Sequence, residues 1–263
     1  MTKARSLVLV LAASTSLASA LFFGDFGTAE PLERRQVIDV SWSLNNHTVY
    51  FNNEAHFIMN VTLYGDTAAD WHQEEVITTA THGGTHFDAP LHFYKDGWSV
   101  SEVPLERLVF PPVALVDIQK KVASNDTYQL SAGDLRDWER QHGRLPAGCV
   151  VFLRTGWYKK YFNRTAYRNQ DADGVFHYPA IGPDAATYLV QGGRAYGIAM
   201  DSVSADVGGP VSHNILLRAQ LYIVENLSGL EKIPATGARA IIQPMKIDGA
   251  SGAPVRVLVI LPN

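Results

Sequence analysis

One short stretch of this sequence concentrates side chains that bind metal ions and move protons. Residues 82–92 read HGGTHFDAPLH, which places His82, His86, Asp88 and His92 within eleven residues. Imidazole nitrogens together with a carboxylate suit divalent zinc, manganese or iron. Imidazole also gains and loses a proton near neutral pH. The stretch therefore indicates a metal site, a proton-transfer site, or both.

The local structure of this stretch follows from its glycines and its proline, which forbid an ordinary helix. An extended segment fits better, because it directs His86 and Asp88 to the same face. A flexible Gly-Gly turn then lets His82 fold back toward that face. We therefore expect a strand at the centre of the motif, not the helical pair of histidines found in many zinc proteases.

Two further segments carry groups that could complete such a site. The polar residues 201–206 (DSVSAD) follow the apolar run 196–200, and strand ends are common places for catalysis in α/β folds. His213 precedes Glu225 by twelve residues, and Glu225 closes the apolar run 221–224. A buried acid is costly unless it is paired or bound to a metal. The alternatives are a loop held by its own Asp and Ser side chains and a histidine that only caps a helix.

Composition and charge limit the class of protein. The chain has 263 residues, of which 46% are hydrophobic and 18% charged, and this predicts one globular domain with a sizeable core. The net charge is -4 and the pI is near 6.1, with no dense run of Lys or Arg. A nucleic-acid-binding face needs such a run to neutralise phosphates, so nucleic acid is not an expected partner.

The first twenty residues have the pattern of a signal peptide. Lys3 and Arg5 precede the apolar run 7–13, and residues 18–20 (ASA) form a cleavage site. The run is too short to span a bilayer, which disfavours the alternative of an uncleaved membrane anchor. We expect a signal peptide over 1–20, an N-terminal extension over 21–36, and a secreted or lumenal mature protein without a membrane segment.

Two further observations bear on a secretory route. Five N-x-S/T sequons are present, and the last follows an apolar stretch that should be buried. Their asparagines are Asn46, Asn60, Asn125, Asn163 and Asn226. Cys149 is the single cysteine, so no intramolecular disulfide can form. It lies in the apolar segment 148–153, which favours a buried structural thiol over a nucleophile.

The remaining sequence predicts a mixed α/β chain. Ser131 with Asp134 has the pattern of an N-cap and capping box, and Gly192-Gly193 has the pattern of a helix end. Residues 161–182 are expected to be an exposed loop. The predicted strands are 37–41, 76–81, 111–118, 148–154, 196–200, 221–224 and 256–260, and the predicted helices are 131–142, 183–191 and 213–219.

The histidine motif resembles the H-x-G-T-H-x-D-x-P-x-H signature of the metal-dependent cyclase family. That family includes bacterial-type kynurenine formamidases and isatin hydrolases. The signature is long and therefore specific, and the resemblance extends over most of the mature chain. The other similar segments are 37–41 (VIDVS), 153–157 (LRTGW), 201–206 (DSVSAD), 213–217 (HNILL) and 225–227 (ENL).

The resemblance implies a fold, a cofactor and an assembly. The fold is a mixed α/β domain over 37–263, with a twisted, barrel-like mixed β-sheet flanked by helices, of the swivelling β/β/α type. The cofactor is Zn²⁺ or Mn²⁺, as one or two ions, and the assembly is a homodimer. The implied site residues are His82, His86 and Asp88 on one ion, Asp88, His213 and Glu225 on a second ion, and His92 as the catalytic acid/base.

The function implied is a secreted metal-dependent hydrolase that cleaves a C–N bond in an aromatic amide or lactam, such as N-formylkynurenine or isatin. A metal ion makes hydroxide available near neutral pH, and His92 would take the proton of water and return it to the leaving nitrogen. Two alternatives stay open. One is a secreted metal-containing binding protein, with His92 as a fourth structural ligand, and the other is a lactone or ester hydrolase.

Overall fold

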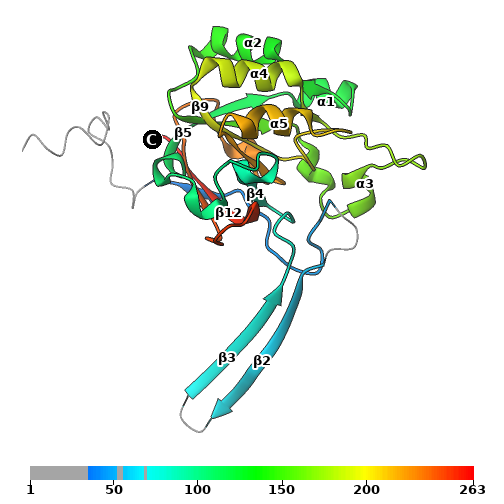
Figure 1. Ribbon diagram of the computed structural model, residues 1–263, viewed down its shortest axis with the longest axis vertical. Helices are drawn as coiled ribbons and strands as arrows, with labels where there is room; N and C mark the ends of the chain where they lie inside the picture. Colours follow the sequence, from blue (N-terminus) through cyan, green and yellow to red (C-terminus); the bar gives the residue numbers. More distant parts are fainter. Residues whose placement is uncertain (1–34, 52–55, 68–69) are drawn as a thin grey trace, which may run out of the picture. The chain divides into compact units, whose positions relative to one another are not determined.

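Seven strands close into a β-barrel in the computed structural model, which describes residues 35–51, 56–67 and 70–263 (Figure 1). Strand β12 is long enough to pair with β11 along one edge and with both β1 (Val37–Asp39) and β4 on the other, which closes the ring. The order around the barrel is β12 (Gly252–Ile260), β11 (Arg239–Pro244), β5 (Val109–Asp117), β7 (Cys149–Arg154), β9 (Ala195–Met200), β10 (Tyr222–Glu225) and β4 (His86–Asp88).

Four neighbouring strands of the barrel, β5, β7, β9 and β10, are parallel. Parallel strands need crossover connections, and helices supply them here. Their carboxyl ends meet at one end of the barrel, so the residues that follow β9 and β10 come together there. The helices are α1 (Gln119–Ser124), α2 (Ala132–His142), α3 (Arg164–Arg168), α4 (Pro183–Gly192) and α5 (Val211–Arg218).

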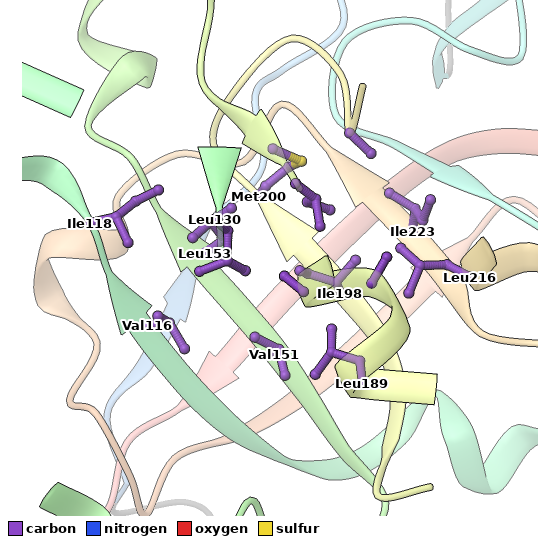
Figure 2. Close-up of a cluster of buried hydrophobic side chains, with 14 of the residues drawn as sticks. Val116, Ile118, Leu130, Val151, Leu153, Leu189, Ile198, Met200, Leu216 and Ile223 are labelled. Atoms are coloured by element: carbon purple, nitrogen blue, oxygen red, sulfur yellow. The ribbon is translucent and has the colours of Figure 1, made fainter. Parts of the chain in front are cut away.

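Side chains alternate between two apolar cores. Val151, Ile198 and Ile223 point outward from the strands and pack with Leu189 of α4 and Leu216 of α5 (Figure 2). The alternate residues of the same strands pack with each other inside the barrel. Strands that are buried on both faces read as near-continuous apolar runs, and this explains why the sequence predicts them well.

Several predicted boundaries are confirmed. Ser131 caps α2 and forms the capping box with Asp134, and Gly193 ends α4 in the left-handed conformation with φ 59°. Cys149 is fully buried, and burial raises the pKa of its thiol to about 12, as expected for a structural cysteine. Among the described residues, none of the helices has the length and hydropathy needed to cross a membrane.

The prediction that residues 161–182 form an exposed loop is wrong. This segment contains α3 and the short strand β8 (Ala180–Ile181), which pairs with β6 (Gln129–Leu130). It also buries three aromatic rings, those of Tyr161, Tyr167 and Tyr178. The Gly and Asp residues of this segment indicate turns and led to the prediction of a loop. The buried tyrosines give no periodic pattern that would have indicated burial.

A two-stranded hairpin is the other departure from the sequence prediction. Strands β2 (Ile58–Thr67) and β3 (Asp70–Thr78) pair with each other and form a separate sheet, where only a strand over 76–81 was predicted. Every residue of β3 is exposed. A ribbon with solvent on both faces needs no alternation of polar and apolar residues, so the usual strand pattern is missing. The predicted signal peptide, 1–20, lies outside the described residues, as does nearly all of the predicted extension.

Candidate active site

Strand β4 places the centre of the histidine motif as predicted. Its alternation directs His86 and Asp88 to one side and Phe87 into the barrel core. Strand β10 runs antiparallel beside it, with Glu225 directly opposite His86. His86 Nε2 lies 3.4 Å from Asp88 Oδ1 and 3.5 Å from Glu225 Oε2. His86 and Glu225, which are 139 positions apart, therefore share one buried site because two strands pair.

The Gly-Gly turn folds His82 back toward Asp88, also as predicted. His82 Nδ1 lies 2.6 Å from Asp88 Oδ1. Gly84 has φ 59°, a conformation that favours glycine. Gly83 is required for a different reason: a Cβ there would lie 2.0 Å from the ring of Tyr50. The turn is therefore built against a buried tyrosine that precedes the hairpin.

The other side of His82 contacts the start of β12. The hydroxyl of Ser251 lies 3.1 Å from His82 Nε2, so one ring nitrogen faces serine and the other faces Asp88. A Cβ on Gly252 would lie 2.3 Å from His82 Cε1. This residue must therefore stay small for the imidazole to keep its place.

Helix α5 brings His213 to the site and Asp206 fixes its orientation. The carboxylate of Asp206 accepts hydrogen bonds from the backbone N–H groups of Ser212 and His213, at 2.8 and 2.9 Å. It also lies 2.7 Å from His213 Nδ1. His213 Nε2 is thereby directed inward, 3.6 Å from Asp88 Oδ2 and 3.4 Å from Glu225 Oε1.

His92 covers the cluster from the end of a 3-10 helix, Pro90–His92. Its ring stacks on His82, with centroids 3.9 Å apart and planes 23° apart, and lies 5.9 Å from the ring of His213. Burial, together with the neighbouring imidazoles, lowers the pKa of His92 to about 4. The ring is therefore neutral at physiological pH and has a lone pair that can accept a proton.

The charges in the cluster balance each other. Burial alone would raise the pKa of Asp88, but His86, His213 and His82 hold it well below its usual range. Burial would likewise lower the pKa of His86, yet Asp88 and Glu225 raise it to about 9. Asp206, Asp88 and Glu225 raise the pKa of His213 well above its usual range. The buried carboxylates of Asp88 and Glu225 are therefore stabilised by nearby positive charge, which protonated histidines or a metal ion can supply.

The donor set fits a divalent metal ion. Asp88 Oδ2 is buried and receives no hydrogen bond from any described residue, which is costly unless a cation binds it. Each carboxylate, of Asp88 and of Glu225, places one oxygen beside His86 and the other beside His213. Tetrahedral ligands about 2.0–2.2 Å from an ion lie about 3.3–3.6 Å apart. The four measured separations, 3.4 to 3.6 Å, match this spacing.

In the part of the chain that the structure describes, two sets of three residues have ligand atoms close enough to share one ion. One is His86, Asp88 and Glu225, and the other is His82, Asp88 and His92. The second set retains the sequence-based alternative in which His92 is a metal ligand. Asp88 belongs to both sets, so this carboxylate is the centre of the cluster.

The two acidic residues of the loop 201–206, Asp201 and Asp206, have different roles. Asp206 orients His213, a role that the sequence alone does not predict. Asp201 lies away from the cluster and accepts hydrogen bonds from the backbone and hydroxyl of Thr155 and from the backbone of Gly156. Burial raises the pKa of Asp201 to about 6. Asp201 thereby holds the turn after β7 in place.

A cavity of about 580 Å³ opens over the cluster. Its inner end carries the His and carboxylate groups, and its outer part is lined by aromatic and small residues. The sequence does not single out Tyr50, Phe51, Ser251 and Gly252, because only long-range folding brings these ordinary residue types to the site. The lining residues outside the cluster are Tyr50, Phe51, Ala80, Thr81, Phe93, Ser204, Gly208 and Pro210.

Comparison with known proteins identifies the family of this chain. The family model described as "Putative cyclase" matches residues 38–207. The chain belongs to this cyclase family. It is 34% identical to the isatin hydrolase of Roseibium aggregatum over 69% of this chain and 72% of the relative. It is 26% identical to the kynurenine formamidase of Bacillus mycoides over 87% of this chain and 99% of the relative.

Solved structures confirm the predicted fold class, a mixed α/β domain with a barrel-like sheet. An isatin hydrolase bound to the product analogue thioisatinate superposes with a TM-score of 0.79 at 29% identity, covering 87% of this chain and 93% of the other. Isatin hydrolase A from Labrenzia aggregata, bound to benzyl benzoate, gives 0.80 at 31% identity, covering 87% and 94%. A protein from Bacillus stearothermophilus described as a "predicted metal-dependent hydrolase" gives 0.63 at 26% identity, covering 86% and 98%.

Proposed function

We propose that this protein is a metal-dependent hydrolase that cleaves the C–N bond of an aromatic amide or lactam. His82, His86, Asp88, His213 and Glu225 would hold one or two Zn²⁺ or Mn²⁺ ions. The observation that carries the proposal is Asp88 Oδ2, a buried oxygen without a hydrogen-bond donor among the described residues, at the centre of imidazoles with metal-ligand spacing. His92 lies over this centre and faces the cavity.

The bound ion would supply a Lewis acid for the carbonyl oxygen and a water molecule of lowered pKa. His92 would accept a proton from the attacking water and pass it to the leaving nitrogen, which must be protonated to depart. Asp206 would keep His213 in the tautomer whose Nε2 lone pair faces the ion, and Ser251 would do the same for His82 Nδ1.

The two curated relatives suggest the substrate class, because their names describe cleavage of an aromatic lactam and of an aromatic formamide. The aromatic lining of the cavity supports a flat aromatic substrate in this chain too. Hydrolysis of an amide, a lactone or an ester would use the same groups of the protein, so only measured turnover can distinguish these substrate classes.

The decisive experiment is hydrolysis of isatin and N-formylkynurenine by protein that is stripped of metal and reloaded with Zn²⁺ or Mn²⁺. We expect turnover to vanish on stripping and to return with one of the ions. His92→Ala should lose turnover while elemental analysis shows unchanged metal content. Retained activity in His92→Ala would refute its role, and a loss of metal would make His92 a ligand instead. Bound metal without turnover of any amide, lactone or ester would favour the binding-protein alternative.

We further propose that the chain is secreted after cleavage near residue 20, with 37–263 as the hydrolase domain. The sequon asparagines Asn46, Asn60, Asn125 and Asn163 are exposed, which glycosylation requires, whereas Asn226 is 4% exposed and inaccessible. N-terminal sequencing of the exported protein tests the cleavage site. Glycopeptide mass spectrometry should find modification at exposed sequons and never at Asn226.

We also propose a homodimer, supported by the hairpin. Its strands expose apolar side chains, including Met59, Val61, Trp71 and Ile77, and an isolated two-stranded ribbon is only marginally stable in water. Light scattering after size-exclusion chromatography should give twice the mass of the chain, and a monomeric mass would exclude the dimer.

A further inference from the structure

We propose that the outer part of the active-site cavity is a subsite for an uncharged apolar group, formed by Phe51 with Phe176 behind it. The substrate would then be a neutral aromatic amide or lactam with an apolar substituent beyond its reacting carbonyl. This inference rests on the proposed function and narrows the substrate class within it.

The distribution of charge in the cavity is the first argument. All the ionisable acids and histidines of the lining belong to the cluster or orient it: His82, His86, Asp88, His92, Asp206, His213 and Glu225. The described lining contains neither Lys nor Arg. A carboxylate held in an amino-acid substrate would find no cationic partner among these lining residues, and the faces of aromatic rings repel it. The guanidinium of Arg168 lies outside the lining, 5.4 Å from the centroid of the Phe176 ring. The cavity therefore favours a neutral substrate over N-formylkynurenine, which carries an amino-acid group.

The aromatic rings at the entrance are the second argument. Among the lining residues Asp88 is 1% exposed and Phe51 is 49% exposed, so Phe51 lies on the solvent-facing side of the cavity, as the exposed Gly208 and Pro210 do. The ring of Phe51 lies 5.1 Å from Phe176, which in turn lies 5.7 Å from the buried ring of Tyr178. An exposed phenylalanine that is held by a second ring gives an apolar group a preformed surface at low entropic cost.

The size of the cavity is the third argument. At about 580 Å³ it lies within the range of about 300–1,000 Å³ typical of pockets that enclose drug-sized ligands. A bare bicyclic lactam such as isatin is much smaller than such ligands. With its carbonyl at the metal cluster, it would leave the Phe51 end of the cavity unfilled.

Three substrates test the subsite: isatin, N-benzylisatin and N-formylkynurenine. The wild-type protein, loaded with metal, should show its highest kcat/KM with N-benzylisatin and its lowest with N-formylkynurenine. Phe51→Ala and Phe176→Ala should each lower kcat/KM for N-benzylisatin about tenfold more than for isatin, through a higher KM, as expected for the loss of one aromatic contact. Higher kcat/KM with N-formylkynurenine than with N-benzylisatin would overturn the proposal.

Phe162→Ala is the matched control. Phe162 is 74% exposed and contacts Trp42 and Tyr161, and it does not line the cavity. This variant should leave all three kcat/KM values unchanged. An equal loss for isatin and N-benzylisatin in Phe51→Ala would show that Phe51 has a structural role only.

Failure of the subsite and failure of the proposed function give different results. If no substrate is hydrolysed, the proposed function fails, and calorimetry of N-benzylisatin binding then tests the subsite alone. Weaker binding to Phe51→Ala than to wild type would support the subsite, and equal binding would overturn it.

Discussion

Replacement of Asp206 by alanine should have two separable effects, because its carboxylate has two functions. It accepts hydrogen bonds from two N–H groups in the first turn of α5, and it contacts His213 Nδ1. The first function stabilises the helix whether or not metal is bound. The second function holds the imidazole in the tautomer that a metal ion needs, so its loss should appear only when metal is present.

The two effects have different expected magnitudes. Loss of the capping interactions costs about 1 kcal/mol of unfolding free energy, which lowers the melting temperature by about 2–4 °C in a domain of this size. If His213 is a metal ligand as proposed, loss of this contact should lower metal affinity about 10–100-fold. At a metal concentration well above Kd, this removes a further ~1.4–2.7 kcal/mol of stabilisation.

The assay is thermal unfolding of chelated and metal-loaded protein, together with titration of metal into the stripped protein. Ser131→Ala is the control, since Ser131 caps α2 and lies in a different helix from His213. It should lower both melting temperatures equally. Asp206→Asn keeps the size of the side chain but offers one acceptor oxygen in place of two, and it should also weaken metal binding. Equal losses with and without metal in Asp206→Ala, and unchanged affinity, would refute the orienting role.

Two further predictions use other contacts. Gly252→Ala should displace the ring of His82, because the added Cβ would lie 2.3 Å from His82 Cε1. Metal titration of the folded variant should then show weaker metal binding than the wild type. Unchanged metal affinity would contradict this role of Gly252. Burial raises the pKa of Asp201 to about 6, so this carboxyl group stays protonated to a higher pH in the folded state than in the unfolded chain. Urea unfolding should show the wild type losing about 2 kcal/mol of unfolding free energy relative to Asp201→Asn between pH 4 and 7. Parallel pH profiles of the two proteins would exclude this.

The sequence predicts the parallel strands and the helices well, because both carry strong local signals. Val151, Ile198 and Ile223 belong to apolar runs of strand length, and Ser131 begins a helix with a capping box. The hairpin β2–β3 and the buried tyrosines of 161–182 lack such signals. Exposed strands need no apolar face, and single buried rings acquire their role only from distant contacts.

The local part of the candidate site is also fixed by the sequence. The spacing of His82, His86 and Asp88, with a Gly-Gly turn between them, suffices to place the three side chains together, because strand alternation and turn geometry act over a few residues. The resemblance to the cyclase signature adds His213 and Glu225, which the sequence places more than 120 residues away.

Only the tertiary structure decides how these distant residues meet. Pairing of β4 with β10 sets Glu225 opposite His86, and α5 with Asp206 turns His213 inward. The same folding leaves Asp88 Oδ2 without a donor among the described residues and puts Phe51 at the entrance of the cavity. Residue types and short spacings determined which chemistry was available. Strand register and helix packing, which depend on contacts far apart in the chain, determined where it could take place.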